Sequence, residues 1–110
     1  MTAKFEIGRS SDSQFYFHLK AGNGEIILQS QQYTAKASAQ AGIDSVKVNA
    51  PHGARYERKT STAHQPYFTL KGANSETLGR SQMYSSESGM EKGIAAVMKE
   101  GPSAPVDDLT

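Results

Sequence analysis

The sequence predicts an α+β fold of two tandem β-β-β-α repeats, related by pseudo-two-fold symmetry and sharing one core of an antiparallel sheet plus two helices. The first observation behind this prediction is an internal repeat. Moving the chain by 51 positions lays residues 5–51 on residues 56–102 without a gap, and 16 of these 47 positions are identical. The second observation is a change of hydrophobic period within each copy, from two to about 3.6 residues. Such a match indicates a duplication, so both copies are expected to fold alike.

The first part of each copy is predicted to form three strands. In the first copy, residues 5–7 and 15–20 alternate apolar and polar side chains, which is typical of strands with one buried face. Residues 25–29 are rich in β-branched and apolar side chains and predict the third strand. The side chains expected on the buried face are Phe5, Ile7, Phe15, Phe17, Leu19, Ile26 and Leu28.

The turns between these strands decide which side chains share a face. Asn23-Gly24 is a hairpin signal because both residues tolerate positive φ. A loop of two or four residues there places Leu19 and Leu28 on the same face. The first turn needs an odd number of residues, such as the three residues 11–13, because a shift of one residue would turn the apolar side chains outward.

The second part of each copy is predicted to be a helix. One apolar stripe follows residue 33 at helical spacing and consists of Ala39, Ile43, Val46 and Ala50. Thr34 in the first copy and Ser85 in the second are the predicted N-caps. Gly42 and Gly93 lie inside the helices, where a glycine costs about 1 kcal/mol relative to alanine. Close packing of the helix on the sheet explains both glycines.

The two copies are expected to form a single domain, 1–110, in which repeat 1 spans residues 5–51 and repeat 2 spans residues 56–102. A unit of this size buries little apolar area when it folds alone, whereas two units can share one core. Residues 49–55 are turn-rich and are predicted to connect the repeats. Residues 103–110 are predicted to be a flexible tail.

Composition excludes several classes of protein. The 110 residues include no cysteine, so disulfide frameworks, thiol catalysis and cysteine-ligated zinc are excluded. No apolar run approaches the roughly 20 residues that a membrane-spanning helix needs. The first residues lack the apolar stretch of a secretory signal, so we expect a cytoplasmic protein. The formal net charge is only +1, without a basic stripe, which makes a nucleic-acid partner a weaker alternative.

The sequence predicts no catalytic residue, no cofactor and no metal site. His18, His52 and His64 are expected on a strand, in the connector and in a turn, and no two of them have the spacing of helical metal ligands. The nucleophile-elbow pattern Gly-x-Ser-x-Gly does not occur. The glycine-rich segment 21–25 joins two strands, so it is interpreted as a hairpin turn and not as a phosphate-binding loop.

The outward face of the predicted strands supplies a candidate interaction surface. When Phe15, Phe17 and Leu19 point inward, the side chains between them point outward. An aromatic residue, a lysine and an aliphatic residue then recur in both copies, as Tyr16, Lys20 and Ile27 and as Tyr67, Lys71 and Leu78. Such a surface suits a peptide, a partner protein or, by stacking, single-stranded nucleic acid. The same residue types are also typical of strand surfaces that bind nothing.

The two copies differ at four positions assigned to the buried face. Repeat 2 replaces Ile7, Phe15, Ile26 and Leu28 with Arg58, Pro66, Thr77 and Gly79. Lost volume and added charge weaken a core. Two interpretations stay open: repeat 2 has a partly exposed sheet edge, or a small polar concavity opens in it. Pro66 favours the edge, because proline is tolerated at strand starts and edges.

Two stretches of the chain, SSDSQFYFHLKAGNGEIILQSQQYTAKASAQAGIDSV and PYFTLKGANSETLGRSQMYSSESGMEKGI, resemble the YegP-like family of small bacterial tandem-repeat proteins. The shorter motifs LKAGNGEIIL and SQMY carry most of this resemblance, which extends over nearly the whole chain. It implies repeats of three strands and a helix, assembled into one sheet with two helices, in a bacterial cytoplasmic protein. It implies no activity, substrate or catalytic residue, because the family is uncharacterised.

The predicted function is that of a small, non-enzymatic cytoplasmic binding or interaction module. We expect a monomer or weak dimer with a protein or peptide partner and no membrane partner. One alternative is a weak nucleic-acid binder that uses the tyrosine and lysine strand faces, against which the near-neutral charge argues. The other is a small-molecule enzyme or carrier that uses the polar concavity of repeat 2, against which the lack of a paired acid–base motif argues.

Overall fold

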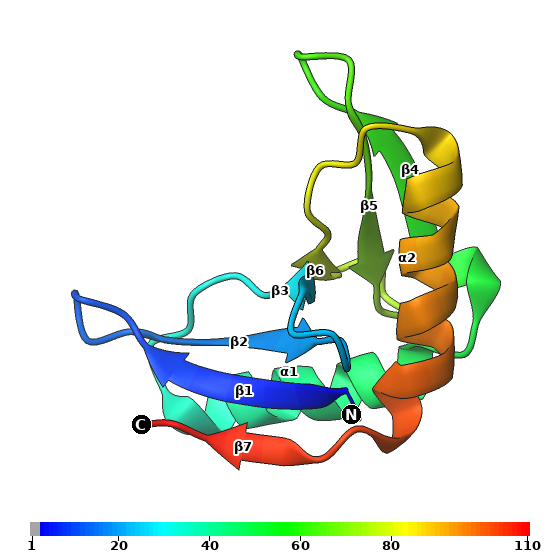
Figure 1. The fold of residues 1–110 in the computed structure, drawn as a ribbon. Helices are drawn as coiled ribbons and strands as arrows, with labels where there is room; N and C mark the ends of the chain where they lie inside the picture. The colour runs from blue at the N-terminus through cyan, green and yellow to red at the C-terminus, as the bar shows by residue number, and fades with distance from the viewer. Residues whose placement is uncertain (1–2) are drawn as a thin grey trace.

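The computed structural model describes residues 3–110, which form one seven-stranded sheet and two long helices (Figure 1). Along the chain the elements are β1 (Lys4–Arg9), β2 (Phe15–Lys20), β3 (Ile26–Gln29), α1 (Lys36–Asn49), η1 (Gly53–Arg55), β4 (Tyr56–Thr60), β5 (Pro66–Lys71), β6 (Thr77–Arg80), α2 (Glu87–Glu100), η2 (Gly101–Ser103) and β7 (Val106–Asp108). The strand order in the sheet is β4-β5-β6-β3-β2-β1-β7. The predicted strands and helices are present, and the α+β class is confirmed.

The two repeats meet edge to edge in the middle of the sheet. β3 and β6 are antiparallel neighbours that pair at Gln29 and Arg80, two residues at equivalent positions of the repeats. This seam therefore lies on the pseudo-two-fold axis. Figure 1 shows the sheet bending sharply there, with α1 and α2 on the outer side of the bend.

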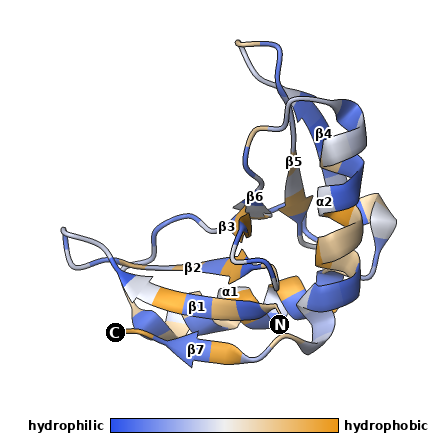
Figure 2. Cartoon of the chain, in the orientation of Figure 1, coloured by the Kyte–Doolittle hydropathy of each residue, from blue (hydrophilic) through white to orange (hydrophobic). Residues whose placement is uncertain are grey.

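One core joins both repeats, as predicted. Its largest fully buried side chains are Phe5, Ile7, Phe17, Leu19, Leu28, Ile43 and Val46 from repeat 1 and Phe68, Leu70 and Val97 from repeat 2. Figure 2 shows apolar residues on the strands close to the corner where β3 and β6 meet, whereas the hairpins that project away from it are mostly hydrophilic. The apolar surface of each half is therefore buried against the helices and the other half.

The first hairpin has the predicted odd-numbered loop. Phe5 pairs with Leu19, so their side chains share the core face. The loop of residues 11–13 is closed by a hydrogen bond from the Ser10 N–H to the Gln14 carbonyl (2.7 Å). Its last residue, Ser13, has a φ of 66°, which is the left-handed conformation that a three-residue hairpin loop requires.

The second hairpin has a loop of three residues, which differs from both predicted lengths. A hydrogen bond from the Ala21 N–H to the Glu25 carbonyl (2.8 Å) closes the loop. Gly24 takes the left-handed position with a φ of 86°. The equivalent residue of repeat 2, Ser75, adopts the same conformation at 69° although it carries a side chain.

A β-bulge in β3 restores the register that this loop shifts. Lys20 pairs with Ile26, but Leu19 pairs with Leu28, so Ile27 is an extra residue. A bulge interrupts the alternation of side chains along a strand. Ile27 is consequently buried, and Ile26, which the alternation placed in the core, is 38% exposed. β6 carries the same irregularity at the equivalent position.

The predicted apolar stripe of α1 is confirmed, because Ala39, Ile43, Val46 and Ala50 are all buried. The predicted N-caps are wrong by one residue. α1 is preceded by Ala35, which offers no side-chain cap, whereas α2 is preceded by Ser86, whose hydroxyl accepts a hydrogen bond from the Gly89 N–H (3.1 Å). The equivalent helices therefore begin differently, and only α2 has the stabilising hydroxyl cap.

A tyrosine ring lies against each helix glycine. A Cβ atom at Gly42 would lie 2.7 Å from the Tyr33 hydroxyl oxygen, and one at Gly93 would lie 2.7 Å from the Tyr84 Cζ. Each tyrosine also stacks on the central phenylalanine of its repeat, with ring centroids 6.3 and 6.4 Å apart. The close packing of helix on sheet that the glycines predicted is confirmed, with the tyrosine ring as the contact.

At the seam the two repeats cannot carry the same side chain. Leu28 is fully buried, and a Cβ atom at the equivalent position, Gly79, would lie 2.8 Å from the Leu28 Cγ. Gly79 therefore makes room for Leu28. The interpretation of Gly79 as a loss of core volume is wrong, because the leucine of repeat 1 fills that space.

Two other differences between the repeats are Arg58 and Pro66, which replace Ile7 and Phe15. Arg58 lies on β4, an exposed strand at the edge of the sheet, and its guanidinium binds the carboxylate of Glu91 at 2.5 and 2.9 Å. Pro66 is the first residue of β5. The interpretation as an exposed edge is confirmed for Arg58, whereas Pro66 starts an inner strand between β4 and β6.

Residues 103–110 are not the flexible tail that the sequence predicted. Residues 106–108 form β7, which pairs in parallel with β1. The Lys4 ammonium lies 3.3 Å from the Asp107 carboxylate, and the Lys36 ammonium contacts the Asp108 carboxylate. The prediction failed because this strand has little apolar surface and is held by backbone hydrogen bonds and ion pairs.

We expect the effects of substitutions at Gly79 and Leu28 on the free energy of unfolding to be non-additive. Gly79→Ala should lower the free energy of unfolding by about 1–3 kcal/mol through overpacking, and Leu28→Ala by about 2–5 kcal/mol through a cavity. The double variant should lose less than the sum, because the added methyl group occupies part of the cavity. Urea unfolding followed by circular dichroism measures all three. Gly53→Ala is the control, since its Cβ would meet only the Met98 Cε, at 4.0 Å; additive losses would contradict the account.

We also expect neither repeat to fold alone. Fragments 1–52 and 53–110 would each expose the apolar surface that the other half covers, so both should be unfolded or self-associating. The ¹⁵N-¹H spectra of the separate fragments measure this. Mixing the fragments should restore a dispersed spectrum, whereas two dispersed monomeric spectra before mixing would contradict the shared core.

Candidate binding site in the bend of the sheet

We call the face of the sheet opposite the two helices the uncovered face. In repeat 1, a cluster of charged side chains fills this face. The Glu6 carboxylate lies 2.6 Å from the His18 Nε2, 3.1 Å from the Lys20 ammonium and 3.4 Å from the Lys4 ammonium. Glu6 is only 6% exposed, so its charge needs these partners. The hydrogen bond from His18 and those from the two lysines lower the pKa of Glu6 to about 2, against the opposing effect of burial.

Tyr16 closes the same face beside this cluster. Its ring lies over Gly8, where a Cβ atom would be 2.6 Å from the Tyr16 Cζ. The Tyr16 and His18 rings are neighbours, with centroids 6.1 Å apart. Only glycine at position 8 permits this placement of the tyrosine, so the face of repeat 1 is covered by its own side chains.

Repeat 2 has different residues at the equivalent positions. Lys59 stands where repeat 1 has Gly8, so Tyr67 cannot lie over the strand as Tyr16 does. Thr69 replaces His18, and its short side chain leaves the space that the imidazole fills in repeat 1. Thr69 is 5% exposed, and its hydroxyl forms no hydrogen bond with any residue that the structure describes.

The acidic residue of repeat 2 is exposed, unlike its counterpart. Glu57, at the position of Glu6, lies 3.0 Å from the Lys59 ammonium and 3.1 Å from the Lys71 ammonium, with 45% of its side chain exposed. The hydrogen bonds from Lys59 and Lys71 lower the pKa of Glu57. Glu57 is thus paired with one lysine of β4 and one of β5. Thr69, and not a charged residue, is buried on this face of repeat 2.

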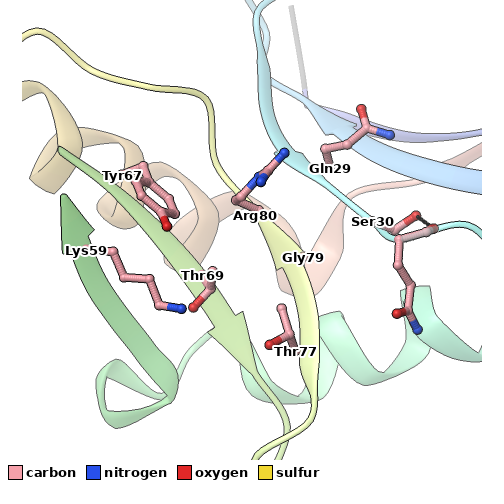
Figure 3. Close-up of a pocket in the computed structure, with 9 residues that line it drawn as sticks. Gln29, Ser30, Lys59, Tyr67, Thr69, Thr77, Gly79 and Arg80 are labelled. Atoms are coloured by element: carbon pink, nitrogen blue, oxygen red, sulfur yellow. Dashed lines mark hydrogen bonds between the residues drawn. The ribbon is translucent and has the colours of Figure 1, made fainter. Parts of the chain in front are cut away.

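The result is a hollow at the bend, on the repeat 2 side of the seam (Figure 3). It has a volume of about 340 Å³. Its lining consists of Gln29, Ser30, Gln31, Lys59, Tyr67, Thr69, Thr77, Gly79 and Arg80. A second hollow of about 400 Å³ shares Gln29 and Arg80 with it. We call these two adjacent hollows the bend hollow.

Most residues that line the bend hollow have polar side chains, and the Glu25 carboxylate accepts a hydrogen bond from one of them, Gln82. No carboxylate lines either part of it within the described chain. Arg80 lies at the boundary of the two parts and forms no salt bridge with residues 3–110, whereas the Lys59 ammonium is already paired with Glu57. Figure 3 shows the Arg80 guanidinium between Tyr67 and Gln29, with the Thr69 and Thr77 side chains in the same hollow. An unpaired guanidinium beside hydroxyl and amide groups suits a small anion.

The predicted interaction surface is assembled only in part. Tyr16 and Tyr67 lie on the uncovered face, but only Tyr67 borders the main hollow. The ammonium groups of Lys20 and Lys71 bind Glu6 and Glu57, both at 3.1 Å, and are not free for a ligand.

The predicted outward placement of Ile27 and Leu78 is wrong. These residues are only 5% and 7% exposed and belong to the core. The reason is the bulge in each third strand, which turns an additional residue inward.

Two residues distinguish the bend hollow: sequence reasoning missed Arg80, and it placed Thr69 on the outward face without selecting it as a site residue. Arg80 replaces Gln29 and Thr69 replaces His18 when the repeats are aligned, so a comparison of outward positions offered a signal. Thr77 was assigned to the buried face, but it is exposed, pairs with the outward-facing Lys71 and lines the hollow on the uncovered face.

Two further features of residues 3–110 limit the chemistry. They contain no cluster of three or more histidine, aspartate or glutamate side chains arranged to hold a metal ion. Within the same range no helix is long and apolar enough to cross a membrane.

We expect Glu6 to make stability depend on pH. Its folded pKa of about 2 lies below the ordinary value of 4.5, so the unfolded chain binds more protons. The stabilisation is present above about pH 5 and is lost as the pH falls toward 2. Glu6→Gln should therefore destabilise at pH 7, by about 1–3 kcal/mol, and converge with the wild type near pH 2. Chemical denaturation across this range measures the effect. Glu57→Gln, at the exposed equivalent position, should have a much smaller one; equal effects would contradict the role of the cluster.

Comparison with known proteins agrees with the repeat structure. Residues 10–57 and 61–108 each match the family model "Domain of unknown function (DUF1508)". The chain is 53% identical to the UPF0339 protein YegP of Escherichia coli O157:H7 and 47% identical to a UPF0339 protein of Shewanella oneidensis, over 110 residues and 100% of each chain.

Two solved structures resemble the fold closely. The solution NMR structure of the Shewanella oneidensis protein has a TM-score of 0.94 at 47% identity and covers 100% of this chain and 93% of that one. The solution NMR structure of YegP from E. coli, described as a protein of unknown function, has a TM-score of 0.94 at 51% identity and covers 100% and 95%. The two matches to the family model, the sequence identity to YegP-like proteins and the similarity of the folds agree. The chain belongs to the DUF1508 family of YegP-like bacterial proteins.

Proposed function

We propose that this protein is a small binding module, not an enzyme, and that its ligand is a small anionic molecule held in the bend hollow. The observation that carries the proposal is Arg80, a guanidinium without a salt-bridge partner in residues 3–110, placed in a hollow without a lining carboxylate. The Thr69 hydroxyl, buried without a partner in that chain segment, supports it. A buried polar group without a hydrogen bond costs free energy that a ligand can recover.

The chemistry of the lining favours a carboxylate or phosphate group. A guanidinium presents a planar set of donors that matches either anion with two parallel hydrogen bonds. Tyr67 and Thr77 offer hydroxyl groups around it, and Gln29 offers an amide. The volume of about 340 Å³ is near the lower limit for small-molecule sites. The ligand is therefore expected to be a small metabolite.

Binding is better supported than catalysis or nucleic-acid recognition. The ionisable residues that line the hollow are Lys59, Tyr67 and Arg80, and they contain no nucleophile paired with a base. Lys20 and Lys71, which a nucleic-acid binder would use for phosphate contacts, are held by glutamates. A nucleic acid would have to displace these ion pairs before it gained its own.

We expect Arg80→Gln to abolish most anion binding without loss of stability. The substitution places at position 80 the residue that repeat 1 carries at position 29, so the fold already accepts it. Titration of ¹⁵N-labelled protein with inorganic phosphate, and separately with acetate, should shift the amide signals of Thr69, Thr77 and Arg80 saturably. Arg80→Gln should weaken the binding about tenfold or more, as the loss of a charge-assisted contact predicts.

The controls separate this site from general attraction of anions. Lys92→Gln removes an exposed charge on α2 that does not line the hollow, and should leave the titration unchanged. Tyr16→Phe should also leave it unchanged, whereas Tyr67→Phe should weaken it. The proposal fails if neither anion shifts the amide signals of Thr69, Thr77 and Arg80 at up to about 10 mM, a concentration well above a millimolar dissociation constant. It also fails if Lys92→Gln and Arg80→Gln weaken binding equally.

A further inference from the structure

The two edges of the sheet are covered differently. β1 and β4 are the first strands of the two repeats and occupy equivalent positions. β7 pairs with the outer edge of β1, but within residues 3–110 no strand pairs with the outer edge of β4. The molecule therefore contains one filled and one open example of the same edge.

The filled edge shows how such a strand is held. β7 runs parallel to β1, with the Phe5 N–H donating to the Pro105 carbonyl (2.8 Å) and the Leu109 N–H donating to the Ile7 carbonyl (2.9 Å). Ion pairs on both faces of the sheet add to these bonds. Lys4 contacts Asp107 on one face, and Lys36 of α1 contacts Asp108 on the other.

The open edge presents the same backbone positions. Arg58 stands at the position of Ile7, so its N–H and C=O point outward where those of Ile7 meet β7. Charged side chains commonly protect an edge strand, but those of β4 are held by neighbours. Arg58 is bound by Glu91 and Lys59 by Glu57. The strand also has no bulge and no proline that would prevent pairing.

A hollow beside β4 provides room for the side chains of an added strand. It has a volume of about 270 Å³ and lies between β4 and the first half of α2. Arg58, Glu87, Met90 and Glu91 are among its lining residues. At the filled edge, Val106 of β7 lies beside Gln40, Ile43 and Asp44 of α1, and the equivalent residues of α2 are Glu91, Ile94 and Ala95. An apolar side chain at the Val106 position of an added strand would therefore lie beside Tyr56 and the middle of α2, and the hollow would take the side chain two residues further along, opposite Arg58.

The charges beside the open edge differ from those beside the filled edge. Arg55 keeps the positive charge of Lys4, so an acidic residue is again favoured on that face. The position equivalent to Asp108 would lie opposite Arg58, whose charge is already balanced by Glu91. Glu87 replaces Lys36 and forms no salt bridge within residues 3–110, so the charge left to meet a residue there is negative where Lys36 is positive. A strand that fits β4 therefore needs an apolar, an acidic and a basic residue in succession, where β7 has an apolar and two acidic residues.

We propose that the outer edge of β4 binds an extended segment of a partner protein as an eighth, parallel strand, with the pattern apolar–acidic–basic. Main-chain hydrogen bonds supply the affinity in this mode of recognition, and side chains at alternate positions supply the specificity. The site is separate from the bend hollow. The tail of a second copy is disfavoured, because its Asp108 would meet Glu87.

The test uses two peptides that differ in one charge. APVDDLT is the sequence of residues 104–110, and APVDKLT replaces its second aspartate with lysine. Titrated into the ¹⁵N-labelled full chain at low salt, APVDKLT should shift the amide signals of residues 56–60 and bind about three- to tenfold more tightly than APVDDLT, as expected for an exposed charge contact. Glu87→Lys should reverse this preference. Glu76→Lys, in an exposed turn, should leave it unchanged.

The direction of the strand has its own readout. A spin label on the amino end of APVDKLT should broaden signals near Tyr56 if the added strand is parallel to β4. Broadening near Thr60 would overturn the parallel arrangement. Absence of shifts in residues 56–60 at up to about 10 mM peptide, or an unchanged preference in Glu87→Lys, would overturn the proposal. The proposal would also be overturned if the peptide shifted only the amide signals of residues that line the bend hollow.

Discussion

The fold depends on the seam between β3 and β6, where equivalent residues of the two repeats approach each other across the pseudo-two-fold axis. A side chain near such an axis meets its own counterpart, and a close-packed interior has room for only one large group there. The Leu28 side chain occupies that space, and Gly79 has no side chain to compete for it. The seam thus allows one continuous core, in which α1 also contacts β5 and β6 and α2 contacts β3. At this position, a leucine in one repeat therefore requires a glycine in the other.

Because the repeats differ in sequence, their uncovered faces differ in structure: one is filled by its own side chains and the other has a hollow. A charged cluster is stable in a buried position only when each charge is paired, and the cluster around Glu6 meets this condition. It closes repeat 1 together with Tyr16. In repeat 2 the shorter Thr69 and the bulkier Lys59 prevent the same closure. The open half of the face is thus a consequence of two substitutions on an unchanged backbone.

The sequence predicted the features that depend on side-chain periodicity and missed those that depend on distant pairing. The repeat, the strands and the apolar helix stripes follow from burial of alternate or helical positions. Ile27 and Leu78 were placed on the wrong face, because a bulge adds a residue without a distinct compositional signal. Tyr67 was identified as a site residue by its outward position. Arg80 was missed, because its place between the two hollows comes from the pairing of β3 with β6 at the seam.

β7 illustrates why a short strand can be invisible in the sequence and yet have a defined place. Both first strands offer it similar backbone groups, so the backbone alone does not decide which edge it joins. The first turn of each helix supplies the difference, since Lys36 attracts Asp108 whereas Glu87 repels it. Without this difference, the tail of one molecule would fit β4 of the next, and such head-to-tail contacts can form open chains. The Lys36–Asp108 contact thus adds to the backbone hydrogen bonds and the Lys4–Asp107 contact that hold the tail on β1, and the proposed partner of β4 differs from the tail in the charge at this one position.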